Sequence, residues 1–122
     1  MKWLLAIPLA MLALPVWSAD PGATTRTEIA HLLQYLESSG CQFQRNGSWY
    51  ASARAAGHLN QKYQYLLKKG LVTNTESFIE RAASESSASG KPYSVKCGDA
   101  AAVSSATWLR GELQRFRTSK AE

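Results

Sequence analysis

Apolar residues recur at helical spacing in four segments of the 122-residue chain, which predicts four amphipathic helices. The first helix is expected over 26–39 and the second over 51–69. A shorter third helix is expected after Thr73, with Phe78 and Ile79 facing inward. The fourth is expected to begin near Ser105, to bury Trp108, Leu109, Leu113 and Phe116, and to end near Arg117.

The predicted helix starts carry capping signals. Thr25-x-x-Glu28 and Thr73-x-x-Glu76 both match the capping box, in which a hydroxyl and a carboxylate satisfy free backbone N–H groups at a helix start. Ser105 is a residue type that caps helices through its hydroxyl oxygen. These three positions are therefore expected to be N-terminal caps.

Two short segments alternate apolar and polar residues as strands do. The segment 41–45 places Cys41 and Phe43 on the same side as Arg45, and the segment 92–97 does the same for Tyr93, Val95 and Cys97. Asn46-Gly47 is the strongest two-residue hairpin signal, because both turn positions need positive φ. The return arm, 48–50, is short and leads into the second helix. We expect the two alternating segments to pair.

These elements predict a mainly α fold with a small β element (α+β). About four helices would pack around a short two- or three-stranded antiparallel hairpin or sheet, with one disulfide. The chain would divide into a signal peptide at 1–18, a disordered leader at 19–25, a single small globular domain at 26–118 and a flexible tail at 119–122.

The N-terminal segment has the pattern of a cleavable secretory signal. Met1-Lys2 supplies a positive start, and 3–17 is an uncharged apolar run. This run is shorter than the ~20 residues that a membrane-spanning helix needs, and cleavage is expected after Ser18 or Ala19. No later segment is apolar enough to span a membrane, so we expect an exported protein with no stable membrane insertion after cleavage.

Cys41 and Cys97 are the two cysteines of the chain. In an oxidising compartment, two cysteines in one small domain most simply form a disulfide. The alternative of a catalytic or metal-binding thiol lacks a CxxC pattern or clustered histidines. A structural disulfide between Cys41 and Cys97 is therefore expected, and it would pin the register of the two strand segments.

The formal net charge is +5, with 14 Lys and Arg residues against 9 Asp and Glu residues. The basic residues are scattered, and Lys68-Lys69 is the only adjacent basic pair. A solvated surface explains this balance, and an anionic envelope partner is the alternative. Export argues against nucleic acid as a partner.

Signatures of catalysis and of cofactor binding are mostly absent from the sequence. There is no GxSxG elbow, SxxK pattern or complete phosphate loop, and His31 and His58 lie on different predicted helices. We therefore expect no metal site, no cofactor and no assignable catalytic residue. Glu28, Glu37 and Glu112 are interpreted as ordinary charges on helix surfaces.

Two groups of polar residues are candidates for binding. His58, Lys62 and Tyr65 recur on one side of the second predicted helix, where they would bind an anionic group or form a solvated face. Arg45, Trp49 and Tyr50 would form a binding lip, or they would pack the hairpin.

Four segments together resemble the domain-of-unknown-function family 5329 of small exported bacterial proteins. They read SSGCQFQRNGSWY, HLNQKYQYLL, ERAASESSASGKPYSVKC and WLRGELQRFR. The resemblance implies a bacterial periplasmic protein but supplies no reaction. It emphasises the hairpin and helix residues named above, Asn46 and Gly47 among them, and adds Ser87, Ser89, Gly90 and Tyr93 of the later loop.

The leading hypothesis is a non-enzymatic accessory or binding protein of the cell envelope. Its partner would be an unknown envelope protein or a small anionic ligand, bound through Arg45, His58 and Lys62 with the loop at Ser87 and Ser89. An inhibitor or immunity-type protein that caps an envelope-targeted enzyme is the alternative. A hydrolase that uses Ser87 or Ser89 with His58 lacks an evident acid partner or oxyanion hole.

Overall fold

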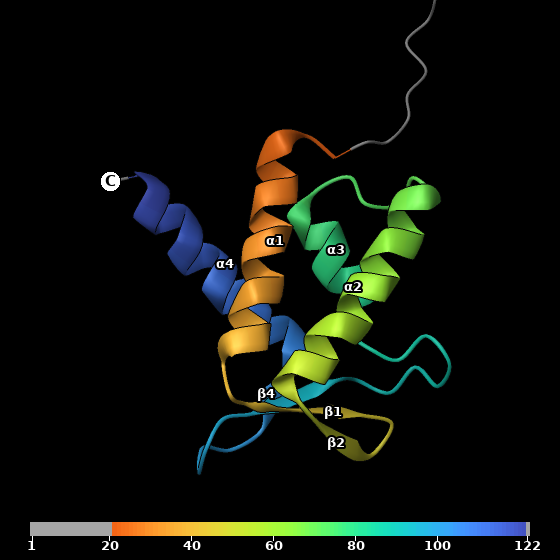
Figure 1. Ribbon diagram of the computed structural model, residues 1–122, viewed down its shortest axis with the longest axis vertical. Helices are drawn as coiled ribbons and strands as arrows, with labels where there is room; N and C mark the ends of the chain where they lie inside the picture. Colours follow the sequence, from red (N-terminus) through yellow and green to blue (C-terminus); the bar gives the residue numbers. More distant parts are fainter. Residues whose placement is uncertain (1–20, 122) are drawn as a thin grey trace, which may run out of the picture.

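The computed structural model describes residues 21–121, and the predicted signal peptide lies outside them (Figure 1). Four helices and four strands follow one another along the chain. They are α1 (Ala23–Ser38), β1 (Gln42–Arg45), β2 (Ser48–Ala51), α2 (Ser52–Lys68), α3 (Thr75–Ala82), β3 (Ser94–Lys96), β4 (Val103–Ser104) and α4 (Ser105–Ala121).

The helix boundaries correct the predicted ones at both ends of the domain. Helix α1 begins at Ala23, so residues 23–25, which we expected to be disordered, are helical. Helix α4 continues past Arg117 to Ala121, into the segment predicted as a tail. No helix within the described residues combines the length and the apolar composition needed to cross a bilayer.

The four strands form one antiparallel sheet in the order β2-β1-β3-β4, and the helices lie on one side of it (Figure 1). The mainly α class with a small sheet is confirmed. The sheet is larger than the two or three strands predicted, because Val103–Ser104 pairs with β3 at its edge.

The inner face of the sheet closes the core beneath the helices. Phe43, Tyr93 and Val95 are each 1% exposed, and the rings of Phe43 and Tyr93 lie 4.9 Å apart. The helices contribute the remaining apolar side chains of the core, principally Ile29, Leu32, Leu36, Leu59, Phe78, Ile79, Leu109 and Leu113. The predicted inward positions are confirmed, except that Trp108 and Phe116 are only half-buried.

The hairpin between β1 and β2 has the predicted two-residue turn. Asn46 and Gly47 have φ values of 51° and 82°, and Arg45 pairs with Ser48 across the turn. A left-handed conformation at both positions matches the right-handed twist of the strands, which explains the Asn-Gly pair. Strand β2 ends at Ala51 and α2 follows at once, so the hairpin is fixed directly to the helix.

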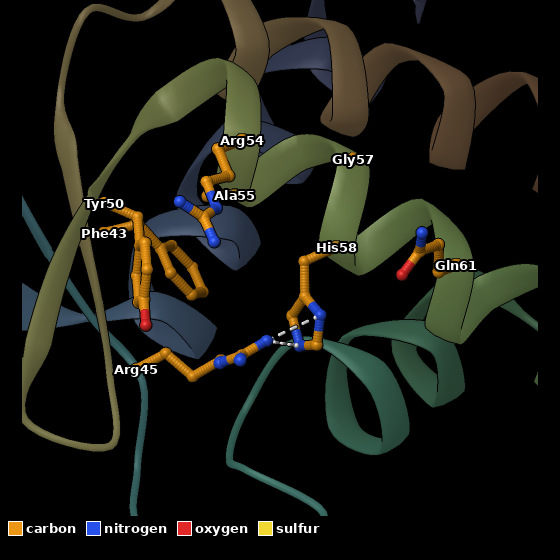
Figure 2. Close-up of a pocket in the computed structure, with 8 residues that line it drawn as sticks. All are labelled: Phe43, Arg45, Tyr50, Arg54, Ala55, Gly57, His58 and Gln61. Carbon is orange, nitrogen blue, oxygen red and sulfur yellow. Dashed lines mark hydrogen bonds between the residues drawn. The ribbon is translucent and has the colours of Figure 1, made fainter.

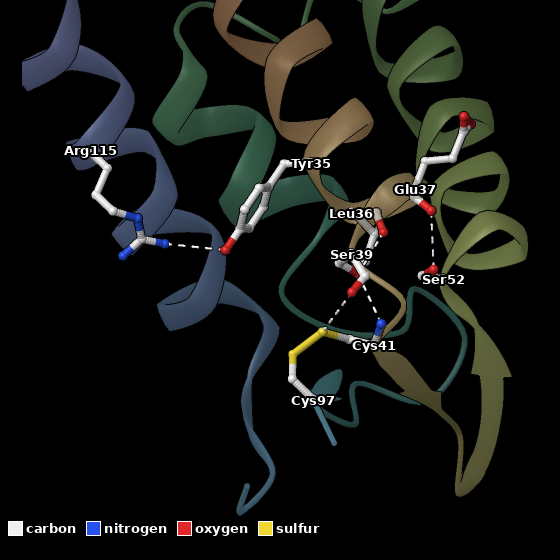
Figure 3. The surroundings of a disulfide bond; sticks show 8 residues. All are labelled: Tyr35, Leu36, Glu37, Ser39, Cys41, Ser52, Cys97 and Arg115. Atoms are coloured by element: carbon white, nitrogen blue, oxygen red, sulfur yellow. Dashed lines mark hydrogen bonds between the residues drawn. A yellow bond between two sulfur atoms is a disulfide. The ribbon is translucent and has the colours of Figure 1, made fainter. Parts of the chain in front are cut away.

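The disulfide joins Cys41 to Cys97, as predicted (Figure 3). Because Gln42 pairs with Lys96, the two cysteines stand opposite each other one position beyond the pairing of β1 and β3, with 4.3 Å between their Cα atoms. The backbone N–H of Cys41 also donates to the Ser39 hydroxyl, which in turn donates to the Leu36 carbonyl. The disulfide thus ties the end of α1 to the sheet.

The predicted caps are wrong in detail. Gly22 precedes α1, and Glu28 lies inside that helix with only 5% of its surface exposed. The capping box of α3 is formed by Asn74 and Ser77, one residue later than predicted. At α4 the Ser104 hydroxyl accepts from the backbone N–H of Thr107, so Ser104 supplies the contact that we expected from Ser105.

Glu28 belongs to a charged cluster between helices instead of the solvated surface that we expected. Arg117 of α4 donates from Nε to the Glu28 carboxylate at 2.7 Å and from Nη1 to Glu76 of α3 at 2.7 Å. The Thr75 hydroxyl donates to the same buried carboxylate. Glu112 is also engaged, since its carboxylate lies 2.6 Å from His31 Nε2. The Glu28–Arg117–Glu76 cluster therefore joins α1, α3 and α4.

Candidate functional site

Four of the predicted binding residues meet where the sheet faces the middle of α2. Arg45 ends β1 and points to the same side as Phe43 because side chains alternate along a strand. Continuing the register that pairs Gln44 with Ser94 sets Tyr93 opposite Arg45. His58 and Lys62 lie four residues apart on α2, which places them on one helix face above this pair.

These side chains form one hydrogen-bonded network, of which Figure 2 shows the contact between Arg45 and His58. Arg45 Nη1 lies 2.8 Å from His58 Nδ1 and 3.1 Å from His58 Nε2. His58 Nε2 is 3.3 Å from the Tyr93 hydroxyl, and Lys62 Nζ donates to that hydroxyl at 3.1 Å. Lys62 also donates to the Glu85 carbonyl at 3.1 Å. Because a guanidinium only donates hydrogen bonds, His58 accepts from Arg45 through an unprotonated ring nitrogen.

The electrostatics of the site favour a neutral His58. Burial lowers the pKa of His58, and the positive charges of Arg45 and Lys62 lower it further. Burial and the charge of Arg45 also lower the pKa of Lys62, against the opposing effect of Glu85. Burial raises the pKa of the Tyr93 phenol, so that it stays protonated. The site therefore concentrates positive charge in surroundings that oppose it.

Three surface depressions open around His58, with volumes of about 410, 280 and 230 Å³. The largest is enclosed by Tyr50 and Phe43 on one side and His58 on the other, with Arg45 and Arg54 reaching toward it (Figure 2). No Asp or Glu lines any of the three depressions within residues 21–121. The basic residues that line them, in addition to His58, are Arg45, Arg54, Lys62 and Arg81.

The fold and the site can be compared with known proteins. The model of a family of unknown function (DUF5329) matches residues 23–117, nearly all of the described chain. The chain belongs to the DUF5329 family. An uncharacterised protein, YfeK, of Salmonella typhimurium strain LT2 is 33% identical over 93 residues, which cover 75% of each chain. No solved structure matches the chain.

Three residues of the site in this DUF5329 protein were missed by sequence reasoning. They are Arg54, Gln61 and Arg81. Arg54 precedes His58 by four residues, so extending the polar stripe of α2 by one turn would have found it. Its guanidinium carbon lies 5.0 Å from the centre of the Tyr50 ring. Arg81 comes from α3, and nothing in its local sequence indicates that α3 brings it beside α2.

The remaining predicted residues are distributed around the site. Tyr50 lines the largest depression, and Ser87 lines the other two. Tyr65 lines the smallest and is 59% exposed. Ser89 donates to the side chain of Asn46 at the hairpin turn. Trp49 is 40% exposed and pairs with Gln44 in the sheet, whereas Tyr50 pairs with Phe43, so neighbouring Trp49 and Tyr50 point to opposite sides of β2.

The arrangement within the described residues does not form a nucleophile–base pair. The hydrogen-bond partners of His58 are Arg45 and Tyr93, and neither Ser87 nor Ser89 bonds to its ring. In residues 21–121, His, Cys, Asp and Glu side chains form no group of three that would hold a metal ion. What the site offers chemically is a set of N–H and O–H donors with a positive charge.

Proposed function

We propose that this protein is an exported, non-enzymatic binding protein of the bacterial cell envelope that holds a small anionic ligand. The observation that carries the proposal is the convergence of Arg45, His58 and Lys62 around the Tyr93 hydroxyl, with no carboxylate lining the depressions there. A bound anion would neutralise part of the positive charge of Arg45 and Lys62.

The donor geometry supports an anionic group at this position. Arg45 uses Nη1 toward His58, and the rest of its guanidinium fork remains to bind a carboxylate or a phosphate in two-point fashion. Lys62 and the Tyr93 hydroxyl lie on the other side of the imidazole ring and add further donors. Like charges brought together at a free-energy cost are typical of binding and catalytic sites.

The contacts of Ser89 and His58 do not support the hypothesis of a hydrolase. Ser89 is bonded to Asn46, and His58 faces a guanidinium. A base that already accepts from Arg45 is poorly placed to take a proton from a hydroxyl. Binding without reaction therefore accounts for the site with fewer assumptions.

Titration of the ¹⁵N-labelled protein with sodium phosphate and with sodium acetate, followed by NMR, tests the binding proposal. Resonances of Arg45, His58 and Lys62 should shift in a saturable way. A double Arg45→Gln and Lys62→Gln variant should lose these shifts. A matched double Lys68→Gln and Lys96→Gln variant, which removes two exposed lysines away from the depressions, should keep them. Shifts that do not saturate, or that survive the first double variant, would reject the site.

Export rests on the N-terminal sequence and is supported by the disulfide, since such bonds persist in oxidising compartments. Mass spectrometry of the protein recovered from a periplasmic extract should find an N-terminus at Ala19 or Asp20. Recovery of the intact chain, starting at Met1, from the cytoplasm alone would contradict the proposal.

A further inference from the structure

The three depressions follow one another along α2. The largest takes Arg54 and Gly57 from the first half of the helix, and the smallest takes Tyr65 and Leu66 from the second half. The middle one is lined by both His58 and Lys62. With a helical rise of about 1.5 Å per residue, the helix positions 54–58 and 62–66 lie about 12 Å apart along the axis. The three together make an elongated surface.

Positive charge is present at both ends of this surface as well as at its centre. Arg54 and Arg45 line the first depression, and Arg81 and Lys62 line the last. Among residues 21–121 the Arg81 side chain has no hydrogen bond and no ion pair, and the Arg54 guanidinium has neither but lies over the Tyr50 ring. The guanidinium groups of Arg54 and Arg81 therefore lie in separate depressions, and neither has an acidic partner among the described residues.

We infer that the ligand is an elongated molecule with at least two anionic groups, held at opposite ends of α2. This inference rests on the proposed function and narrows its ligand class. Arg45 and Arg54 would hold one anionic group, and Arg81 with Lys62 the other. A single small ion would leave one of the two arginine positions without a counter-charge.

The lining between the charges fits an uncharged linker. Phe43 and Tyr50 form an apolar wall in the first depression, and Leu66 and Tyr65 form one in the last. Gln61 lines both and offers an amide to polar atoms of the linker. A chain with an anionic group at each end, carboxylate or phosphonate, is the simplest molecule that matches this order of surfaces.

Linear dicarboxylates of increasing length test the inference directly. Succinate, adipate, suberate and sebacate are titrated into the ¹⁵N-labelled protein and compared with monocarboxylates of the same chain lengths. Affinity should rise with the length of the dicarboxylate until both ends are reached. The longer dicarboxylates should then bind up to about five-fold more tightly than the matched monocarboxylates, the largest gain expected from one exposed ion pair. A parallel series of bisphosphonates shows which anionic group is preferred.

Arg81→Gln supplies the decisive variant, and Arg110→Gln, on the exposed side of α4 and outside the depressions, is its matched control. Arg81→Gln should reduce the affinity ratio of a long dicarboxylate to its matched monocarboxylate to about one, whereas Arg110→Gln should keep the wild-type ratio. Arg54→Gln should weaken both series, since it alters the end at which a single group binds.

The outcomes separate this inference from the function on which it rests. Monocarboxylates and dicarboxylates of equal affinity, together with no effect of Arg81→Gln, would overturn the two-group ligand and leave the anion site intact. The absence of saturable shifts with any of these anions would overturn the proposed function, and the inference with it.

Discussion

His58 is surrounded by polar side chains from β1, α2 and the segment before β3. Arg45 and the Tyr93 hydroxyl contact its ring, and Lys62 donates to that hydroxyl. Burial is the largest cause of the lowered pKa of His58, and the two positive charges add to it. The pKa of the His58 imidazole should therefore respond to any charge added to the site or removed from it.

Removing one positive charge should raise the pKa of His58. In Lys62→Met the pKa of His58, followed through the imidazole resonances in an NMR titration, should move up toward 6.5, its usual value. Lys68→Met, one exposed lysine further along α2, should leave it in place. A bound anion should raise the same pKa, so that ligand affinity increases as the pH falls. An unchanged pKa in Lys62→Met would show that Lys62 and His58 are not coupled.

The same lowered pKa makes His58 a source of acid sensitivity in the fold. Well above pH 6.5 the histidine is neutral in both the folded and the unfolded chain, so its contribution to stability is constant. Below pH 6.5 the unfolded chain takes up a proton that the folded site resists. The free energy of unfolding should therefore fall as the pH drops below 6.5, and His58→Gln should flatten this part of the profile in urea denaturation at several pH values.

Lys62 should contribute to anion binding and, at the same time, lower the free energy of unfolding of the domain. Burial and the charge of Arg45 lower its pKa, which means that its charged form is disfavoured in the fold. We expect Lys62→Met to raise the free energy of unfolding by about 0.5–1 kcal/mol, as relief of an unfavourable charge often does. Urea denaturation measures this gain, and Lys68→Met is again the control. A clear loss of stability would assign Lys62 a mainly structural role.

At the scale of the elements, the Glu28–Arg117–Glu76 cluster joins three helices through one guanidinium. Glu28 is 5% exposed, and Arg117 donates to it from both Nε and Nη2. Replacing Glu28 with Gln leaves Arg117 paired with Glu76 alone among the carboxylates and puts a neutral amide in the buried position of Glu28. We expect a loss of about 2 kcal/mol, less than for a fully buried pair, because the Arg117 side chain is itself 39% exposed. Glu80→Gln, on the exposed side of α3, should change stability little.

The Glu28–Arg117–Glu76 cluster should also make the free energy of unfolding depend on pH in the acid range. The Arg117 hydrogen bonds lower the pKa of Glu28 and of Glu76, despite the opposing effect of burial. Their stabilising contribution is complete above pH 4.5 and is lost as the pH falls toward the lowered values. In a denaturation series between pH 3 and pH 6, the wild type should lose stability steeply below pH 4.5, and Glu28→Gln should lose less.

The sequence patterns predicted the elements and failed at their ends. Apolar spacing identifies all four helices, because burying one face requires that spacing, and Asn46-Gly47 fixes the hairpin. The Thr25 box failed because Glu28 gains more from Arg117, a residue 89 positions away, than from capping. Strand β4 was missed because its two residues pair only once β3 is in place.

In the candidate site, too, local sequence patterns predict some features, and contacts between distant elements determine the others. Strand alternation places Arg45 on the same face as Phe43, and i, i+4 spacing places His58 beside Lys62. The position of Arg81 depends on how α3 packs against α2, and no local pattern records that contact. The arrangement within one element is thus readable from sequence, and the arrangement between elements is not.

For the molecule as a whole, the disulfide is the main covalent constraint on a small domain. Cys41 and Cys97 are 56 positions apart, and closing such a loop restricts the unfolded chain by about 4 kcal/mol in the chain-entropy model. A double Cys41→Ser and Cys97→Ser variant should lower Tm by about 15 to 30 °C. Wild-type protein measured with and without a reductant is the matched comparison, and equal Tm values would contradict this role.

Arg45, His58, Lys62 and Tyr93 also have a consequence for how the family has diverged. Each depends on another for a hydrogen bond, and they come from β1, α2 and the segment before β3. A relative that lost Lys62 would leave the Tyr93 hydroxyl without one of its partners. We therefore expect the four positions to change together among relatives, while the core positions around them change one at a time.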